Sequence, residues 1–111
     1  MGSHFDGNCK LLADLIAQTD LDYIEAFTPA PDTDMTLDDA VSAWPDKCLW
    51  INFPSSLHLA SKEKIAQTTR ELLESASNHK RFLIGITEDV PADRWQENFK
   101  TISETITDWT N

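Results

Sequence analysis

Four short apolar runs recur along the chain, and each is followed by polar residues and then by a stretch with helical spacing. The runs are Met1–Phe5, Leu21–Phe27, Cys48–Phe53 and Phe82–Ile86. Because they are apolar throughout rather than alternating, they are typical of parallel strands covered on both faces and joined by right-handed crossovers. We therefore predict an α/β fold of four β-α units with a parallel sheet. This is the content of half a (β/α)8 barrel or of a small open doubly wound sheet, and the spacing alone does not separate the two.

Helical stretches separate the runs. The first is expected to start at Asn8, whose side chain can cap it, and to end near Thr19. Its expected apolar face consists of Leu11, Leu12, Leu15 and Ile16. Thr36 and Asp39 form a capping-box variant that opens a second helix, which runs through Ala43.

Two longer amphipathic stretches follow. Ser61 is the expected cap of the third helix, and the fourth is predicted over residues 92–109. The apolar side of the third helix consists of Ile65, Thr69, Leu72, Leu73 and Ala76. We interpret Trp50, within a strand, and Trp95, on the last helix, as core residues rather than as a platform for a substrate.

Length and charge limit the classes of protein to which the chain can belong. With 111 residues it is one domain, so we treat 1–111 as a single α/β domain. A formal net charge of −10 argues against nucleic acid and against anionic membrane surfaces as partners. No apolar run approaches the ~20 residues of a membrane span, and the start shows no signal-peptide pattern. Because Cys9 and Cys48 have no CxxC neighbour, we interpret them as reduced thiols of a cytoplasmic protein.

Polar side chains stand at or just after the carboxyl ends of the predicted strands, which lie at the same edge of a parallel sheet. His4 and Asp6 are two residues apart and so share one face of the first strand, Glu25 lies near the end of the second, and Glu88 follows the fourth. One imidazole and three carboxylates at one mouth would need a cation to offset their mutual repulsion. We predict that His4, Asp6 and Glu88 bind a divalent metal, with Glu25 as a catalytic base or a further ligand. The oxygen-rich ligand set suits zinc or a harder ion such as manganese or iron.

Three of these residues, His4, Asp6 and Glu88, also have a structural interpretation. His4 can be an ordinary strand-end histidine, with Asp6 turning into Gly7-Asn8. Glu88 can stabilise the N-terminus of the helix that follows it. The other two histidines, His58 and His79, are expected at the surface.

Three segments resemble motifs of the uroporphyrinogen decarboxylase and cobalamin-dependent methyltransferase superfamily, a group of TIM-barrel enzymes. They are His4-Phe5-Asp6-Gly7-Asn8, residues 22–29, and residues 85–91 with the later Glu97-Asn98. The resemblance spans nearly the whole chain and corresponds to the C-terminal part of those enzymes. It implies half of a TIM barrel, as a fragment of a metal-dependent enzyme that performs methyl transfer or a related lyase reaction on a small-molecule substrate.

The resemblance also bears on the site residues. In the methyltransferase branch a His-x-Cys pair and a distant Cys bind a zinc ion that activates a thiol. His4, Asp6 and Glu88 stand at the matching positions, so carboxylates replace both cysteines. This replacement implies a harder metal preference than that of the thiol-activating branch. In the decarboxylase branch, arginines near the N-terminus contact the acidic substrate. That region is absent from this chain, and tetrapyrrole decarboxylation is therefore not supported.

Two functions from different classes remain open. One is an enzyme fragment that can be inactive alone, and the alternative is a non-catalytic α/β module for assembly or partner binding. If the purified protein contains stoichiometric metal, and replacing His4 by Ala removes it, the enzyme-fragment hypothesis is favoured. In either case we expect a homodimer, because four parallel strands leave two unpaired edges and Phe82–Ile86 lacks the charge or proline that protects such edges. Two copies could close an eight-stranded barrel.

Overall fold

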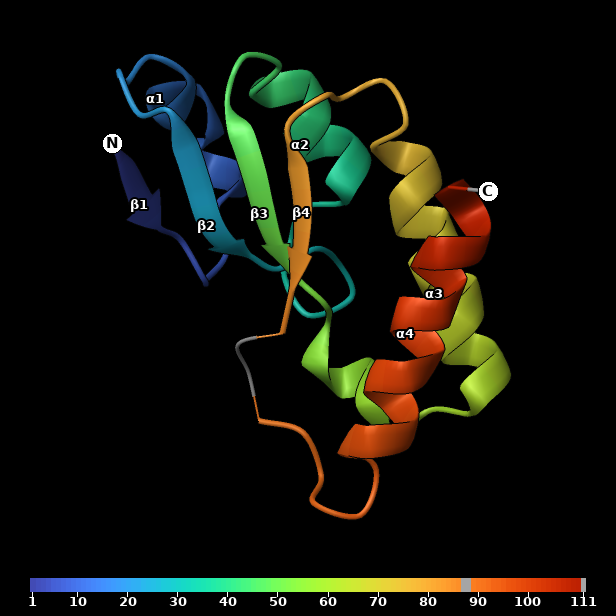
Figure 1. Cartoon of the computed structure of the whole chain (residues 1–111). Coiled ribbons are helices and arrows are strands. Elements are labelled where there is room, and N and C mark those ends of the chain that lie inside the picture. Colours follow the sequence, from blue (N-terminus) through green and yellow to red (C-terminus); the bar gives the residue numbers. More distant parts are fainter. Residues whose placement is uncertain (87–88, 111) are drawn as a thin grey trace.

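A single parallel sheet forms the centre of the molecule, as the computed structural model of residues 1–86 and 89–110 shows (Figure 1). Its strands are β1 (Gly2–His4), β2 (Tyr23–Phe27), β3 (Cys48–Asn52) and β4 (Phe82–Gly85). They are all parallel and lie in the order β1-β2-β3-β4. Each strand lies inside its predicted apolar run, and the predicted α/β fold of four β-α units is confirmed.

The helices alternate with these strands. They are α1 (Ala13–Ala17), α2 (Leu37–Ala43), α3 (Lys62–Ser75) and α4 (Trp95–Thr110), with short 3-10 turns η1 (Lys10–Leu12) and η2 (Ser55–Leu59). In Figure 1, α1 and α2 lie behind the sheet, and α3 and α4 pack against each other beyond β4. None of the helices in the described part of the chain is long and apolar enough to cross a membrane.

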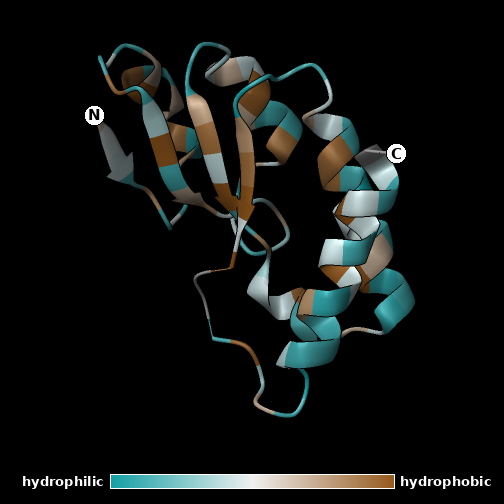
Figure 2. Ribbon diagram, in the orientation of Figure 1, coloured by the Kyte–Doolittle hydropathy of each residue, from teal (hydrophilic) through white to brown (hydrophobic). Residues whose placement is uncertain are grey.

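The helices cover only one face of the sheet. Alternate strand residues on that face are completely buried: Ile24, Leu49 and Ile51. The large side chains on the opposite face, Tyr23, Trp50 and Leu83, are 38%, 41% and 52% exposed. Within the single chain, therefore, only one face is covered instead of the predicted two, and Trp50 does not lie in the core as predicted. Cys and Leu are as hydrophobic as the buried residues, whereas Tyr and Trp lie near the middle of the hydropathy scale (Figure 2). A run of such residues therefore does not show whether one face of the strand or both faces are covered.

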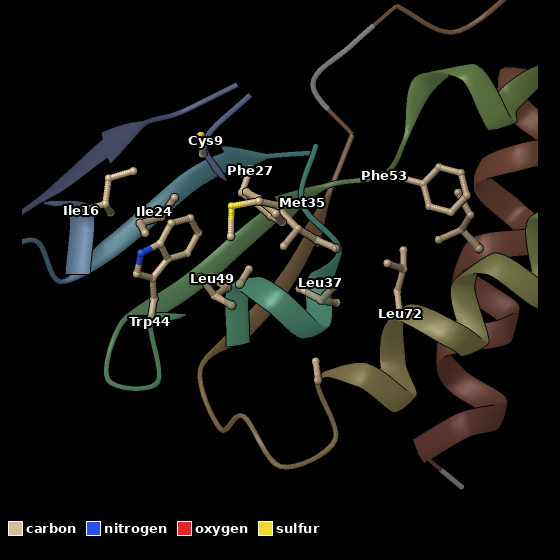
Figure 3. Packing of buried hydrophobic residues seen from close by; sticks show 14 of the residues in the cluster. Cys9, Ile16, Ile24, Phe27, Met35, Leu37, Trp44, Leu49, Phe53 and Leu72 are labelled. Carbon is tan, nitrogen blue, oxygen red and sulfur yellow. The ribbon is translucent and has the colours of Figure 1, made fainter. Parts of the chain in front are cut away.

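The core fills the space between the sheet and the helices (Figure 3). Trp44 is fully buried, donates from Nε1 to the carbonyl of Ala13 at 3.0 Å, and meets Phe27 edge to face with ring centroids 5.6 Å apart. The core extends through Phe53 toward the last two helices, and Leu72 of α3 is part of the same cluster. Burial of these side chains holds α2 and α3 to the sheet and fixes the positions of the strand ends.

The helix starts show which local signals decide the structure. Thr36 and Asp39 form the predicted capping box of α2, and Ser61 caps α3 by accepting from the amide of Lys64 at 3.2 Å, so both predictions are confirmed. The first helix differs from its prediction. Asn8 accepts a hydrogen bond from the amide of Asp34 instead of capping a helix, and the helical segment is shorter than predicted.

The predicted apolar face of the first helix is also wrong. Leu11 and Leu15 are 96% and 62% exposed, and only Ile16 of the four residues is buried. The backbone changes from a 3-10 turn to an α-helix between Leu12 and Ala13, so the spacing of an ideal helix does not apply. The final helix lies close to its prediction, except that Trp95 is 45% exposed rather than part of the core.

Candidate functional site

Three of the four predicted site residues meet at the carboxyl ends of β1 and β2. The imidazole of His4 lies between two carboxylates: Nδ1 forms a hydrogen bond to Oε2 of Glu25, and Nε2 lies 3.3 Å from Oδ2 of Asp6. Because an ionised carboxylate can only accept, Nδ1 of His4 is the donor to Glu25. The fourth residue, Glu88, lies outside the described residues.

The sheet register brings His4 and Glu25 together. They are direct partners across β1 and β2, and the amide of Phe5 extends this ladder to the carbonyl of Glu25 at 3.0 Å. Both side chains therefore lie on the open face of the sheet. The spacing of Asp6 two residues after His4 returns its carboxylate to the same side, as the sequence predicted.

A β-bulge follows Glu25 immediately. The register between β2 and β3 shifts between Glu25 and Phe27, and Ala26 has a φ of 62°, in the left-handed region that favours glycine. A left-handed non-glycine residue costs about 1–3 kcal/mol, and such strain is concentrated at functional sites. The bulge leaves Glu25 on the open face and directs Phe27 into the core.

The electrostatics of the cluster centre on His4. The hydrogen bond to Glu25, followed by that to Asp6, raises the pKa of His4 above its ordinary value of 6.5. More than half of the imidazole surface is exposed, so solvent can exchange this proton freely. The cluster can therefore hold a proton at the mouth of the sheet and transfer it to or from a bound molecule.

A small cavity of about 150 Å³ adjoins the cluster. Its lining consists of Asp6, Thr28, Asp32, Thr33 and Ser55. Asp32 also binds the start of η2, accepting from the amide of Ser56 at 3.1 Å and from the hydroxyls of Ser55 and Ser56. This ties the loop after β2 to the loop after β3 and gives the cavity a fixed wall.

The other two histidines are buried, so their predicted surface positions are wrong. His79 hydrogen-bonds through Nε2 to the carbonyl of Lys47 at 2.7 Å. His58 is enclosed by Phe53 and Asn98, whose amide nitrogen lies 2.9 Å from the carbonyl of His58 and 3.3 Å from its Nδ1. Burial, and secondarily the charge of Arg94, lowers the pKa of His58.

The arrangement of His4 and Asp6 can be compared with that of metal ligands. Two ligands of a tetrahedral ion with bonds of about 2.1 Å lie about 3.4 Å apart, close to the 3.3 Å between Nε2 and Oδ2. Metal-bound histidines usually donate their other ring N–H to a carboxylate, which is the position of Glu25. These two donors and their supporting carboxylate fit a metal ion.

Two ligands alone do not make a metal centre. Within residues 1–86 and 89–110, no group of three or more His, Cys, Asp and Glu side chains is placed to hold an ion. β1 and β4 form opposite edges of the sheet, and their ends are about 14 Å apart at ordinary strand spacing. The predicted meeting of Glu88 with His4 and Asp6 stays a prediction.

Sequence reasoning missed the polar layer beneath the cavity. Asn52, the last residue of β3, is fully buried and donates to the hydroxyl of Thr28 at 3.4 Å, which in turn donates to the carbonyl of Ala26 at 3.2 Å. The signal was present, since Asn52 is a polar residue at the end of an apolar run. Asp32 could not have been found in this way because it lies in an acidic loop.

Comparison of the sequence with protein-family models and with curated proteins found no match. Any functional conclusion therefore depends on the geometry of the site and on the resemblance of its motifs.

Proposed function

We propose that this chain is one half of a metal-dependent barrel enzyme, similar to the uroporphyrinogen decarboxylase-like methyltransferases, and that it acts on a small molecule at the carboxyl ends of its strands. The observation that carries the proposal is the position of His4 between Asp6 and Glu25. Methyl transfer or a related lyase reaction is the activity that the resemblance implies. A cytoplasmic location agrees with the free thiols of Cys9 and Cys48.

The strand order supports a barrel half over a doubly wound sheet. In a doubly wound sheet the order reverses once, which places helices on both faces. Here the order follows the sequence, and the helices lie on one face. Successive right-handed crossovers in one direction produce this arrangement, which is the one that barrels use.

His4 and Asp6 would hold the metal ion, with Glu88 as the third proposed ligand. Bound there, the ion would supply Lewis-acid activation of a substrate oxygen. The residues of the chain have separate tasks. Glu25 orients the imidazole through Nδ1, and Thr28, Thr33 and Ser55 line the cavity that part of the substrate would enter. Glu25 is thus placed as a positioning residue, and its proposed role as a base requires that it release His4.

One observation favours the alternative, a catalytically silent assembly module. A protonated His4 contacts both carboxylates, so each carboxylate has a cationic partner without any metal. As part of an assembly module, the contacts among His4, Asp6 and Glu25 would have a structural role: they would fasten the loop after β1 to strand β2.

Metal content separates the two functions. Purified chain equilibrated with zinc, manganese or iron(II) and then dialysed should retain about one ion per chain by elemental analysis. His4→Ala and Asp6→Ala should lose it, and Glu25→Gln should weaken the affinity by about 10–100-fold. Asp46→Asn, at the opposite end of the strands, is the matched control and should bind normally. Absence of metal from the unaltered chain, or retention by His4→Ala, would leave the assembly module as the function.

A further inference from the structure

The open face of the sheet is apolar and almost uncharged. In register across the four strands it carries His4, Glu25, Trp50 and Leu83. His4 and Glu25, which contact each other, are the only charged residues within the four strands. In a chain of net charge −10, all the other acidic residues that the structure describes lie in helices, loops and turns. This distribution, with few charged side chains on the open face and many on the helical side, is the one expected if the open face is buried and the helical side is exposed to solvent.

On the open face, each edge strand has a glycine that is covered by an aromatic ring of the neighbouring inner strand. A Cβ on Gly2 would overlap the ring of Tyr23, and a Cβ on Gly85 would lie 2.7 Å from Nε1 of Trp50. The rings of the inner strands therefore extend over the edge strands β1 and β4. Neither edge strand has a neighbour on its outer side within the described chain.

The row of helices also ends in exposed apolar side chains at both sides. At the β1 side, Leu11 and Leu15 project from η1 and α1 with 96% and 62% of their surface exposed. At the far side, Trp109 of α4 is 44% exposed. Beside each edge strand of the sheet, the adjoining helix of the helical layer thus also exposes apolar side chains.

We infer that a second copy of this chain completes the molecule, closing an eight-stranded barrel with a two-fold axis along the strands. This rests on the proposed half-barrel architecture. The occupant must cover the open face and pair with two parallel edges at once, so it must itself be a parallel sheet of matching width. A second copy meets this requirement: β4 of each chain pairs with β1 of the other, and eight strands form the closed barrel.

The helical layers close by the same operation. The α4 helix of one copy comes beside the α1 helix of the other, so Trp109 can cover Leu11 and Leu15. The carboxyl end of β4, after which Glu88 follows in the sequence, adjoins β1 of the other copy. The two clusters of His4, Asp6 and Glu25 then share one mouth.

Sedimentation equilibrium of the full chain at micromolar concentration tests the inference. The expected species has twice the 12.5 kDa mass of the chain. Leu83→Lys, on the open face, and the double variant Leu11→Glu/Leu15→Glu should each raise the dimer dissociation constant by about 100-fold or more, since each buries an unpaired charge. Leu59→Glu is the control. Leu59 is an exposed leucine of η2 that belongs neither to the open face nor to α1 or α4, so this variant should remain dimeric.

Three results would overturn the inference: an unaltered chain that is monomeric, an open assembly larger than two copies, or a dimer that is insensitive to Leu83→Lys. Circular dichroism confirms that each variant is folded, which is expected because every altered side chain is exposed in the single chain. Metal content is measured on the same samples. A monomer that binds metal contradicts the dimer alone, and a dimer without metal contradicts the proposed metal site alone.

Discussion

Two histidines in this small domain are placed in opposite electrostatic settings. His4 is exposed between two carboxylates, which favour its protonated form, whereas His58 is enclosed in the core, which favours its neutral form. Their contributions to stability therefore depend on pH with opposite sign. The contribution of His4 is complete below pH 6.5 and is lost as the pH rises through its raised pKa, while that of His58 is complete above pH 6.5.

Replacing Glu25 by Gln should lower the pKa of His4 toward its ordinary value, because Glu25 is the largest cause of the upward shift. Asp6→Asn should lower it less. The measurement is an NMR titration of the His4 imidazole, with Asp46→Asn as the control that leaves the titration unchanged. A His4 titration that is identical in Glu25→Gln and the unaltered chain would show that the contact between them does not form in solution.

His58 should make the protein less stable in mild acid. The unfolded chain binds a proton at its ordinary pKa, whereas the folded chain resists protonation because His58 is buried and faces Arg94, with Asp32 opposing the effect. Relative to His58→Phe, the unaltered chain should lose unfolding free energy as the pH falls from 7 to 5. Urea denaturation at both values is the measurement. A difference between the two proteins that does not change with pH would contradict this account.

At the scale of single elements, local signals were readable from the sequence and non-local ones were not. The capping box of Thr36 and Asp39 needs only four residues, so it could be predicted, and so could the cap at Ser61. The bulge at Ala26 depends on how β2 pairs with β3, and alanine gives no sign of a left-handed backbone. The exposed Leu11 and Leu15 depend on what packs against the helix, which its own spacing does not reveal.

Loss of the α2 cap should have a measurable cost. Thr36→Ala removes the acceptor for the amide of Asp39, and we expect it to lower the unfolding free energy by about 1 kcal/mol. Ser42→Ala, on the exposed side of the same helix, should cost nothing because alanine is the better helix former. Equal losses in the two variants by urea denaturation would show that the cap is not responsible.

The bulge beside Glu25 makes Ala26 sensitive to the shape of its replacement. Ala26→Val should destabilise the protein by more than about 2 kcal/mol, because a β-branched residue is strongly disfavoured at positive φ and the site is buried. Ala26→Gly accommodates the backbone and should change the stability by less than about 1 kcal/mol. If thermal unfolding ranked the two variants in the reverse order, the left-handed conformation would not be correct.

For the whole molecule, the sequence was sufficient for the strands, their parallel order and the gathering of His4, Asp6 and Glu25. These follow from apolar runs and from the rule that parallel strands carry polar residues at one end. It was not sufficient for the open face, because large side chains such as Trp50 and Leu83 are also common in protein cores. Nor could it place His58, whose burial depends on Asn98, forty residues later in the chain.

Alkylation of Cys48 tests most directly whether the open face is covered. Cys48 is partly exposed and shares this face with Trp50, two residues later in β3. Cys9 is the internal control, since it is buried and its pKa is raised by that burial. With the rate of modification followed by mass spectrometry across protein concentrations, we predict that Cys48 reacts readily in dilute solution and becomes protected as the concentration rises, while Cys9 stays slow throughout. A Cys48 rate that is fast and independent of concentration up to the millimolar range would contradict the account.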